Sequence, residues 1–547
     1  MINVRHLSFV TLLATLLPSL LLAHAHAAEG ANEHIVSRIE ALNGGFPVEV
    51  LGSPLMASKA LPAFYASNGY RLAWESMEYR QQLAGAIGRA SDDGLLPGDY
   101  HADLLASLAS APIADISPAR RADIDLLFSD AFLVFGSHLL EGKVNPQTIH
   151  AEWTANRRQR KMESVLTDAL DSGDIGETLD ALRPAHPAYR QLMEVRRSLA
   201  SEAGAPWQPL ADKPTLRPGE QDPRLPEIRH RLAALGDLEP SGNEDQATQL
   251  YNAPLETAIK AFQARHGLEA DGVIGRDTFK ALNLTPAARI RQLDATLERW
   301  RWLPESLGET YVLVNIAGFE LTMVDRGSEV LRKRVIVGKP FRQTPVFSDQ
   351  IEYLVFNPTW TVPHTIMLQD QLPQILKDPD YLARLNISVY RGWGADRVRI
   401  DPAMIDWSAL GKNNFPYQLV QEPGPQNALG QVKFMLPNQY DVYLHDTPGR
   451  GLFAKSERTF SSGCIRVEQP FDLAERLLAG SPNWSRARID GIVDGQAPQT
   501  VLLPRPVPVH LQYWTAWVDG EGRIQYRNDI YERDARLLKE LKGSMEG

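Results

Sequence analysis

Residues 461–467 read Ser-Ser-Gly-Cys-Ile-Arg-Val and contain the only cysteine of the 547-residue chain. A cysteine attacks a carbonyl as the thiolate, so it needs a nearby base or positive charge and N–H groups for the oxyanion. Gly463 allows a sharp backbone turn beside Cys464, and Arg466 adds a permanent positive charge. Alternating apolar residues predict a strand here, followed by a helix over residues 470–478. This stretch therefore has the features of a nucleophile loop.

The base that we expect for this thiol is His445. It ends the apolar-aromatic run 442–444 and precedes a loop over residues 446–451, and catalytic side chains often lie where a strand meets a loop. A lone cysteine is more often a small buried hydrophobic residue, and a lone histidine is more often structural. An unpaired cysteine in an exported chain is unusual, however, and this favours a reactive thiol.

These residues resemble the signature of the L,D-transpeptidase (YkuD-type) catalytic domain. The likeness rests on His445-Asp446 followed by residues 461–466. It extends upstream through Val337-Gly338-Lys339-Pro340 with Thr344-Pro345, Phe356 to Pro363, and Asn427-Ala428-Leu429-Gly430 with Lys433-Phe434. The large periplasmic members of Gram-negative bacteria join this domain to a scaffold domain and a peptidoglycan-binding module. The resemblance thus implies a multidomain α+β protein, in which the catalytic domain is mostly β, with the cysteine and histidine at one edge of a cleft.

Composition agrees with a multidomain soluble protein. The chain is too long for one core, and 44% hydrophobic with 23% charged residues is typical of globular domains. The 67 acidic residues outnumber the 57 basic ones, which argues against a nucleic-acid partner. With a single cysteine, no intramolecular disulfide can form.

The amino terminus predicts export. Residues 1–27 combine an early Arg5, an apolar stretch from Leu7 to Ala23 and a small-residue cleavage site at Ala25-His26-Ala27. We expect a cleaved signal peptide, a periplasmic location and no membrane span in the mature chain. The alternative is an uncleaved anchor in the inner membrane.

The rest of the chain divides by pattern. Residues 28–203 have helical spacing, most clearly over 124–139, and predict a helical scaffold domain; residues 204–223 are a proline-rich linker. Residues 224–285 resemble the small three-helix peptidoglycan-binding module, through Phe262 to Leu268 and Asp271 to Thr278. The resemblance implies glycan binding, and the alternative from the residues alone is a helical spacer with nothing in its groove.

Residues 286–506 form the predicted catalytic domain. After a helix over 291–303, the period changes to two in residues 311–315, 320–324 and 334–337, which predicts strands. The segment 364–438 breaks that rhythm, with helical patterns at 366–376 and 381–385 and no predicted strand. Long insertions usually have a role of their own, so we interpret it as a lid over the cleft. Residues 507–547 predict a C-terminal hairpin and helix.

The residues and the resemblance together assign roles. His445 takes the proton of Cys464, or stabilises a thiolate already favoured by Arg466, and N–H groups at Gly463 and Cys464 face the oxyanion. The resemblance implies that the backbone carbonyl of Asp446 orients the histidine, whereas its side chain is expected to be an ordinary loop carboxylate. The predicted substrate-binding residues are Arg466, Ser461, Ser462 and Trp360.

Each of those four residues has an alternative. Arg466 can anchor a substrate carboxylate or fix the loop through a salt bridge. Ser461 matches the serine of the motif and is expected to support the loop, whereas Ser462 stands where many relatives carry a histidine. Trp360 can line the donor site or belong to the core.

The resemblance implies that the protein crosslinks third-position diaminopimelate residues through a cysteine thioester, with no cofactor. Peptidoglycan stem peptides would be donor and acceptor, cell-wall synthases are candidate partners, and a carbapenem should acylate Cys464. One alternative is an L,D-carboxypeptidase, in which water resolves the same thioester. Another is a non-catalytic cell-wall-binding scaffold. A zinc peptidase would need His364, His445, Asp446 and Cys464 to meet around a metal, and no H-E-x-x-H helix occurs.

Overall fold

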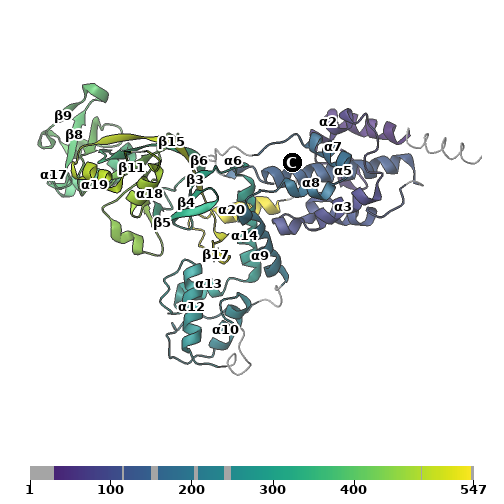
Figure 1. The fold of residues 1–547 in the computed structure, drawn as a ribbon, viewed down its shortest axis with the longest axis horizontal. Coiled ribbons are helices and arrows are strands. Elements are labelled where there is room, and N and C mark those ends of the chain that lie inside the picture. Colours follow the sequence, from purple (N-terminus) through teal and green to yellow (C-terminus); the bar gives the residue numbers. More distant parts are fainter. Residues whose placement is uncertain are drawn as a thin grey trace, which may run out of the picture.

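The computed structural model describes residues 30–113, 116–149, 158–201, 207–239, 248–481 and 483–543. The expected signal peptide, residues 1–27, lies outside these ranges. Figure 1 shows a helical N-terminal unit, a small teal helical unit that projects from the middle of the molecule, and a sheet-rich unit at the opposite end. Among the described helices, none is both long and apolar enough to cross a membrane.

The N-terminal unit is helical, as predicted. Its helices are α2 (Ala60–Ser67), α3 (Met77–Gly88), α4 (Ala102–Leu108), α5 (Pro118–Glu141), α6 (Pro146–Ile149), α7 (Met162–Ser172), α8 (Ile175–Ala181) and α9 (Pro187–Ser201). The long helix α5 begins at the Ser117 cap with proline at its first position, and is buried over most of its length. It is the central core helix that the spacing over 124–139 predicts. A short hairpin of β1 (Glu49–Val50) and β2 (Ser53–Pro54) packs beside it.

The small unit consists of α10 (Leu225–Ala234), α12 (Ala253–Arg265) and α13 (Arg276–Leu282) around their own apolar core. Gln263 fixes the turn that precedes α13. Its amide nitrogen donates to the Val273 carbonyl at 2.9 Å, and its amide oxygen accepts from the Gly272 N–H at 2.9 Å. The predicted three-helix module is therefore confirmed, and it leads into α14 (Pro286–Arg301).

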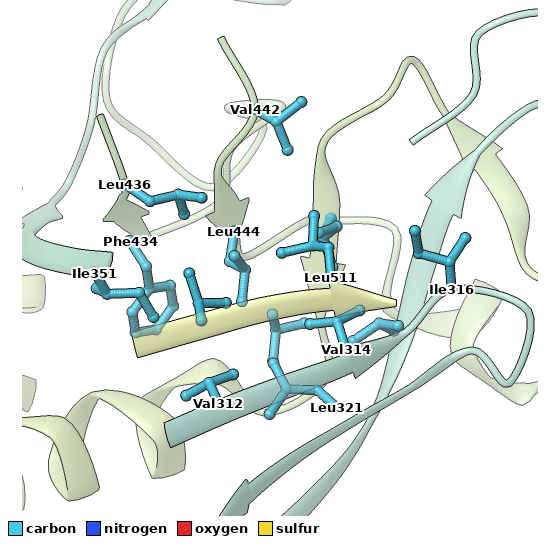
Figure 2. Packing of buried hydrophobic residues seen from close by; sticks show 14 of the residues in the cluster. Val312, Val314, Ile316, Leu321, Ile351, Phe434, Leu436, Val442, Leu444 and Leu511 are labelled. Atoms are coloured by element: carbon cyan, nitrogen blue, oxygen red, sulfur yellow. The ribbon is translucent and has the colours of Figure 1, made fainter. Parts of the chain in front are cut away.

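The sheet-rich unit is built on nine strands. Its strand order is β13 (Thr459–Ser461), β5 (Ser328–Gly338), β14 (Ile465–Val467), β12 (Leu444–His445), β11 (Val432–Met435), β6 (Phe347–Phe356), β15 (Gln499–Gln512), β3 (Thr310–Asn315) and β4 (Glu320–Asp325). Because β4 also pairs with β5, the sheet closes on itself. Side chains from β3, β6, β11, β12 and β15 meet inside it, as Figure 2 shows for Val312, Phe434 and Leu444. The strands predicted over 311–337 are confirmed as β3, β4 and β5.

The segment interpreted as a lid differs from the prediction. It contains a second, four-stranded sheet of β7 (Trp360–Thr361), β10 (Tyr417–Gln421), β8 (Ile387–Arg391) and β9 (Val398–Ile400). Its helical part runs through α15 (His364–Ile366), a π-helical turn η3 (Met367–Gln371), α16 (Leu372–Lys377) and α17 (Tyr381–Arg384). The expectation of a strand-free segment over 364–438 was wrong, because so long an excursion pairs its own backbone groups. The predicted end of this segment, residue 438, was also too late, since β11 belongs to the main sheet.

The boundary predicted at residue 507 also differs from the structure. Residues 507–512 belong to β15, which lies between β6 and β3 in the main sheet, and not to a separate hairpin. The hairpin itself is β16 (Ala516–Val518) with β17 (Ile524–Tyr526), followed by α20 (Arg533–Lys542). Two further helices, α18 (Pro470–Leu477) and α19 (Arg486–Asp494), cover the sheet after the nucleophile loop.

Helix α14 joins the units at the centre of the molecule (Figure 1). Its Arg301 is fully buried, is ion-paired with Glu298, and donates to the Asp93 carbonyl at 2.7 Å and to the Tyr189 hydroxyl at 2.8 Å. Both of these acceptors belong to the scaffold domain. The buried charges of α14 therefore attach this helix to the scaffold domain.

Candidate active site

Strand pairing places the predicted nucleophile and base on one face of the sheet. Strands β12 and β14 are parallel, with Leu444 opposite Ile465 and His445 opposite Arg466. Leu444 and Ile465 are fully buried in the core. Because side chains alternate along a strand, His445 and Arg466 lie on the other face, and so does Cys464, two positions before Arg466. These residues are separate in the sequence, and strand pairing places them on one face of the sheet.

His445 is held by the backbone of the next residue. Its Nδ1 lies 2.6 Å from the carbonyl oxygen of Asp446, which can only accept, so Nδ1 carries the proton and Nε2 is the basic nitrogen. Burial, and then the positive charge of Arg466, lower the pKa of His445 to about 3. The imidazole is therefore neutral at physiological pH.

Cys464 is half-buried and is a free thiol. Its Sγ lies 3.8 Å from the carbonyl oxygen of Asp441, and burial raises the pKa of the thiol above its ordinary value. Tyr443 and Lys433 act in the opposite direction and partly offset this effect. The resting thiol is therefore protonated.

Two neighbours of the thiol had no role in the sequence interpretation. Tyr443 interacts with Cys464 and with Trp360, the predicted donor-site residue at the start of the lid. Lys433 on β11 is the register partner of His445, and its Nζ lies 3.8 Å from the centroid of the Tyr443 ring. The sequence of β11 could have pointed to Lys433. The residues on either side of it are buried in the core, so alternation along the strand places the Lys433 side chain on the opposite face of the sheet.

Hydrogen bonds between its own residues stabilise the nucleophile loop. Ser461 Oγ donates to the Cys464 carbonyl at 2.6 Å and accepts from the Gly463 N–H at 3.2 Å. Gly463 has a φ of +119°, which favours glycine, and its carbonyl accepts from Thr344 Oγ1 at 2.8 Å. Ser461 thus supports the loop. The Gly463 N–H, predicted as an oxyanion donor, is engaged by Ser461 instead, whereas the Cys464 N–H has no partner among the described residues.

The side chain of Asp446 is bound away from the imidazole. Its Oδ2 accepts from the Gln431 N–H at 3.0 Å and lies 3.7 Å from Arg450 Nη2. A side chain at Gly430 would clash with this carboxylate, since an added Cβ would lie 2.4 Å from it. Only the backbone carbonyl of Asp446 contacts His445, as expected.

Arg466 has no salt bridge within the described parts of the chain, and its Nε is buried without a hydrogen-bond partner. The structure therefore does not contain the loop-fixing ion pair that was one alternative for this residue. Ser462 is exposed, and its Oγ accepts from Arg342 Nη1 at 2.9 Å. His364 is also exposed, at the start of the lid, and the described residues contain no group of three potential metal ligands.

Three family models match parts of the chain. Residues 309–486 match the model of the L,D-transpeptidase catalytic domain (YkuD). The chain carries an L,D-transpeptidase catalytic domain. Residues 59–195 match the scaffold domain, and residues 221–282 match the "putative peptidoglycan binding domain". The order scaffold, peptidoglycan-binding module and L,D-transpeptidase domain is the one that the sequence predicts.

Individual relatives match over part of their length. A "putative L,D-transpeptidase" of Haemophilus influenzae is 35% identical over 260 residues, which is 48% of this chain and 50% of the relative. The N-acetylmuramoyl-L-alanine amidase CwlM of Mycobacterium tuberculosis is 37% identical over 76 residues, 13% of this chain and 19% of CwlM. The chain thus spans half or less of the curated relatives it matches.

Among solved structures, the L,D-transpeptidase (Yku) of Stackebrandtia nassauensis is 13% identical with a TM-score of 0.21, covering 56% of this chain and 97% of that one. The L,D-transpeptidase of Mycobacterium smegmatis is 13% identical with a TM-score of 0.17, covering 37% and 58%.

Proposed function

We propose that this L,D-transpeptidase-domain protein is a periplasmic enzyme that crosslinks third-position diaminopimelate residues of peptidoglycan through a thioester on Cys464. The observation that carries the proposal is the arrangement of a neutral His445, oriented by the Asp446 carbonyl, on the same sheet face as the thiol and Arg466. The peptidoglycan-binding module supports a peptidoglycan substrate, and the pattern of residues 1–27 supports export, with an inner-membrane anchor as the alternative.

The first half-reaction forms the thioester. The Nε2 atom of His445 takes the proton of Cys464 as Sγ attacks the carbonyl of the diaminopimelate L-centre. The Cys464 N–H faces the oxyanion of the tetrahedral intermediate. Collapse of this intermediate breaks the bond to the terminal D-alanine, whose amine leaves with the proton from His445.

The second half-reaction transfers the acyl group. The side-chain amine of a second diaminopimelate attacks the thioester and gives its proton to His445, and the thiolate leaves and is reprotonated. The positive charges of Lys433 and Arg466 stabilise the thiolate in both halves. The unpaired guanidinium of Arg466 also suits a substrate carboxylate, the functional alternative for this residue.

Mass spectrometry of products from tetrapeptide-stem muropeptides tests the proposal, with the wild type compared with Cys464→Ala. We expect a dimer that lacks one D-alanine, made only by the wild type. Shortened monomers alone would identify an L,D-carboxypeptidase. The absence of both products with a folded wild-type protein would contradict catalysis and favour a cell-wall-binding scaffold.

A further inference from the structure

Arg342 links the nucleophile loop to the lid. Its Nη1 donates to Ser462 Oγ at 2.9 Å and to Asp370 Oδ2 at 2.5 Å. Its Nη2 donates to Gln369 Oε1 at 2.6 Å and to Asp370 Oδ1 at 3.2 Å. Asp370 and Gln369 belong to the π-helical turn η3 of the lid. The guanidinium therefore already binds the Asp370 carboxylate through both Nη atoms. It also contacts Ser462, which lies two residues before Cys464.

The backbone around Arg342 is fixed against the nucleophile loop. The Lys339 N–H donates to the Ser461 carbonyl at 3.0 Å, and Thr344 Oγ1 donates to the Gly463 carbonyl. A Cβ at Gly338 would lie 2.1 Å from the Arg342 carbonyl oxygen, so only glycine permits this approach. The backbone that carries Arg342 is therefore anchored to the nucleophile loop by contacts that do not involve the lid.

The lid side of the contact is less firmly held. The Asp370 side chain is 41% exposed, whereas that of Arg342 is 12% exposed. Asp370 lies on a single π-helical turn, a feature that often occurs at functional sites. An exposed carboxylate on such a turn can be exchanged for another carboxylate, while the arginine stays in place.

We propose that Arg342 is the binding site for a carboxylate of the donor stem peptide, and that Asp370 occupies this site in the free enzyme. The inference rests on the proposed function, because it concerns the donor of that reaction. An extended residue spans roughly 3.5 Å, so carboxylates one residue from the scissile carbonyl reach the surroundings of Ser462. The planar guanidinium matches a carboxylate through two parallel hydrogen bonds. Substrate binding would then release the lid from the nucleophile loop.

A purely structural tie between Arg342 and the lid makes a different prediction. If the pair only holds the lid, loss of either partner loosens the same contact and changes donor binding in the same direction. If Arg342 binds the donor carboxylate, Asp370→Asn removes a competitor and tightens binding, whereas Arg342→Gln weakens it. The two partners of one ion pair then act with opposite sign.

Calorimetry on the full chain with Cys464→Ala measures donor binding without turnover. Disaccharide-tetrapeptide is titrated into this protein and into versions that also carry Arg342→Gln, Arg342→Lys or Asp370→Asn. We expect Arg342→Gln to weaken binding roughly tenfold or more, because a charge-assisted bidentate contact is lost, and Asp370→Asn to strengthen it. Arg342→Lys keeps the charge without the fork and should fall between the wild type and Arg342→Gln.

Donors amidated at the terminal D-alanine or at the diaminopimelate side-chain carboxyl identify which carboxylate is bound. Amidation of the bound group should weaken binding to Cys464→Ala, but not further when Arg342→Gln is present. Asp378→Asn is the matched control, since Asp378 pairs with Arg384 elsewhere in the lid and is 40% exposed. A shift of the same sign for Arg342→Gln and Asp370→Asn, or an amidation effect that persists without Arg342, would overturn the inference. A wild type that binds the donor without forming dimers would contradict the proposed function alone.

Discussion

At the scale of single residues, Cys464 and His445 are both held in their neutral forms. Burial raises the pKa of the Cys464 thiol and lowers that of His445 to about 3, so neither side chain is charged at neutral pH. A neutral pair avoids the cost of separated charges in a partly buried site before substrate arrives. The cations Lys433 and Arg466 then stabilise the thiolate when it forms.

This state predicts the pH dependence of thiol reactivity. Alkylation of Cys464 by iodoacetamide should accelerate roughly tenfold per pH unit through the neutral range, because only the thiolate reacts and the pH lies below the thiol pKa. No step should appear between pH 5 and 8, since His445, with a pKa of about 3, does not titrate there. Lys433→Met should slow alkylation at each of these pH values, because it removes a charge that lowers the thiol pKa.

Lys433→Arg is the control, since it keeps the positive charge beside the Tyr443 ring. The rates are measured by mass spectrometry of the modified chain, which has no other cysteine. A titration step near pH 6.5, or faster alkylation of Lys433→Met, would contradict this account of the site.

Sequence reasoning reached only some of these residues. Cys464 and His445 could be singled out because each lies in a short segment with a recognisable pattern, and the role of the Asp446 carbonyl came from the family resemblance. Lys433 and Arg342 could not be given a role, because each acts through residues distant in the chain. Strand register places Lys433 beside His445, and a loop contact places Arg342 beside Ser462.

At the scale of elements, the lid behaves as a separate insertion. Its core residues, between Val362 and Leu419, form a cluster that shares no member with the core of the main sheet. Gln421 pairs with Trp360, so the chain enters and leaves the lid at one place. Sequence patterns revealed its helices but not its strands, since β9 has three residues and β8 ends at a glycine turn.

Because the ends of the lid are adjacent, replacing residues 362–420 by a short Gly-Ser linker should leave the catalytic domain folded. Cys464 should then be alkylated faster, because the lid that Arg342 links to the nucleophile loop is gone. The KM for the donor should rise. Circular dichroism, alkylation rates and crosslinking kinetics measure these effects. Unchanged crosslinking by the folded deletion protein would show that the segment is not a functional lid.

At the scale of the whole molecule, buried contacts fix the domains to one another. The motif Phe262 to Leu268 of the peptidoglycan-binding module packs on the C-terminal hairpin. There His266 stacks on Tyr526, and Arg527 donates to the Arg265 carbonyl at 3.0 Å. A Cβ at Gly267 would lie 2.4 Å from the Arg527 side chain. Part of the motif that resembles a glycan-binding module therefore serves packing in this chain, a use that the sequence of the module alone could not reveal.

The scaffold depends on the buried pair Arg301–Glu298 in α14, and this predicts its stability. Arg301→Ala should cost about 3–5 kcal/mol, because it leaves the fully buried Glu298 without its cation and the Tyr189 hydroxyl without its donor. Arg190→Ala is the matched control: Arg190 pairs with Asp180 on the surface, and its loss should cost less than about 1 kcal/mol. Urea unfolding followed by tryptophan fluorescence compares the midpoints. Equal midpoints for the two variants would mean that the buried pair does not hold the scaffold to α14, whereas partial recovery in Arg301→Met with Glu298→Gln would identify the stranded carboxylate as the cause.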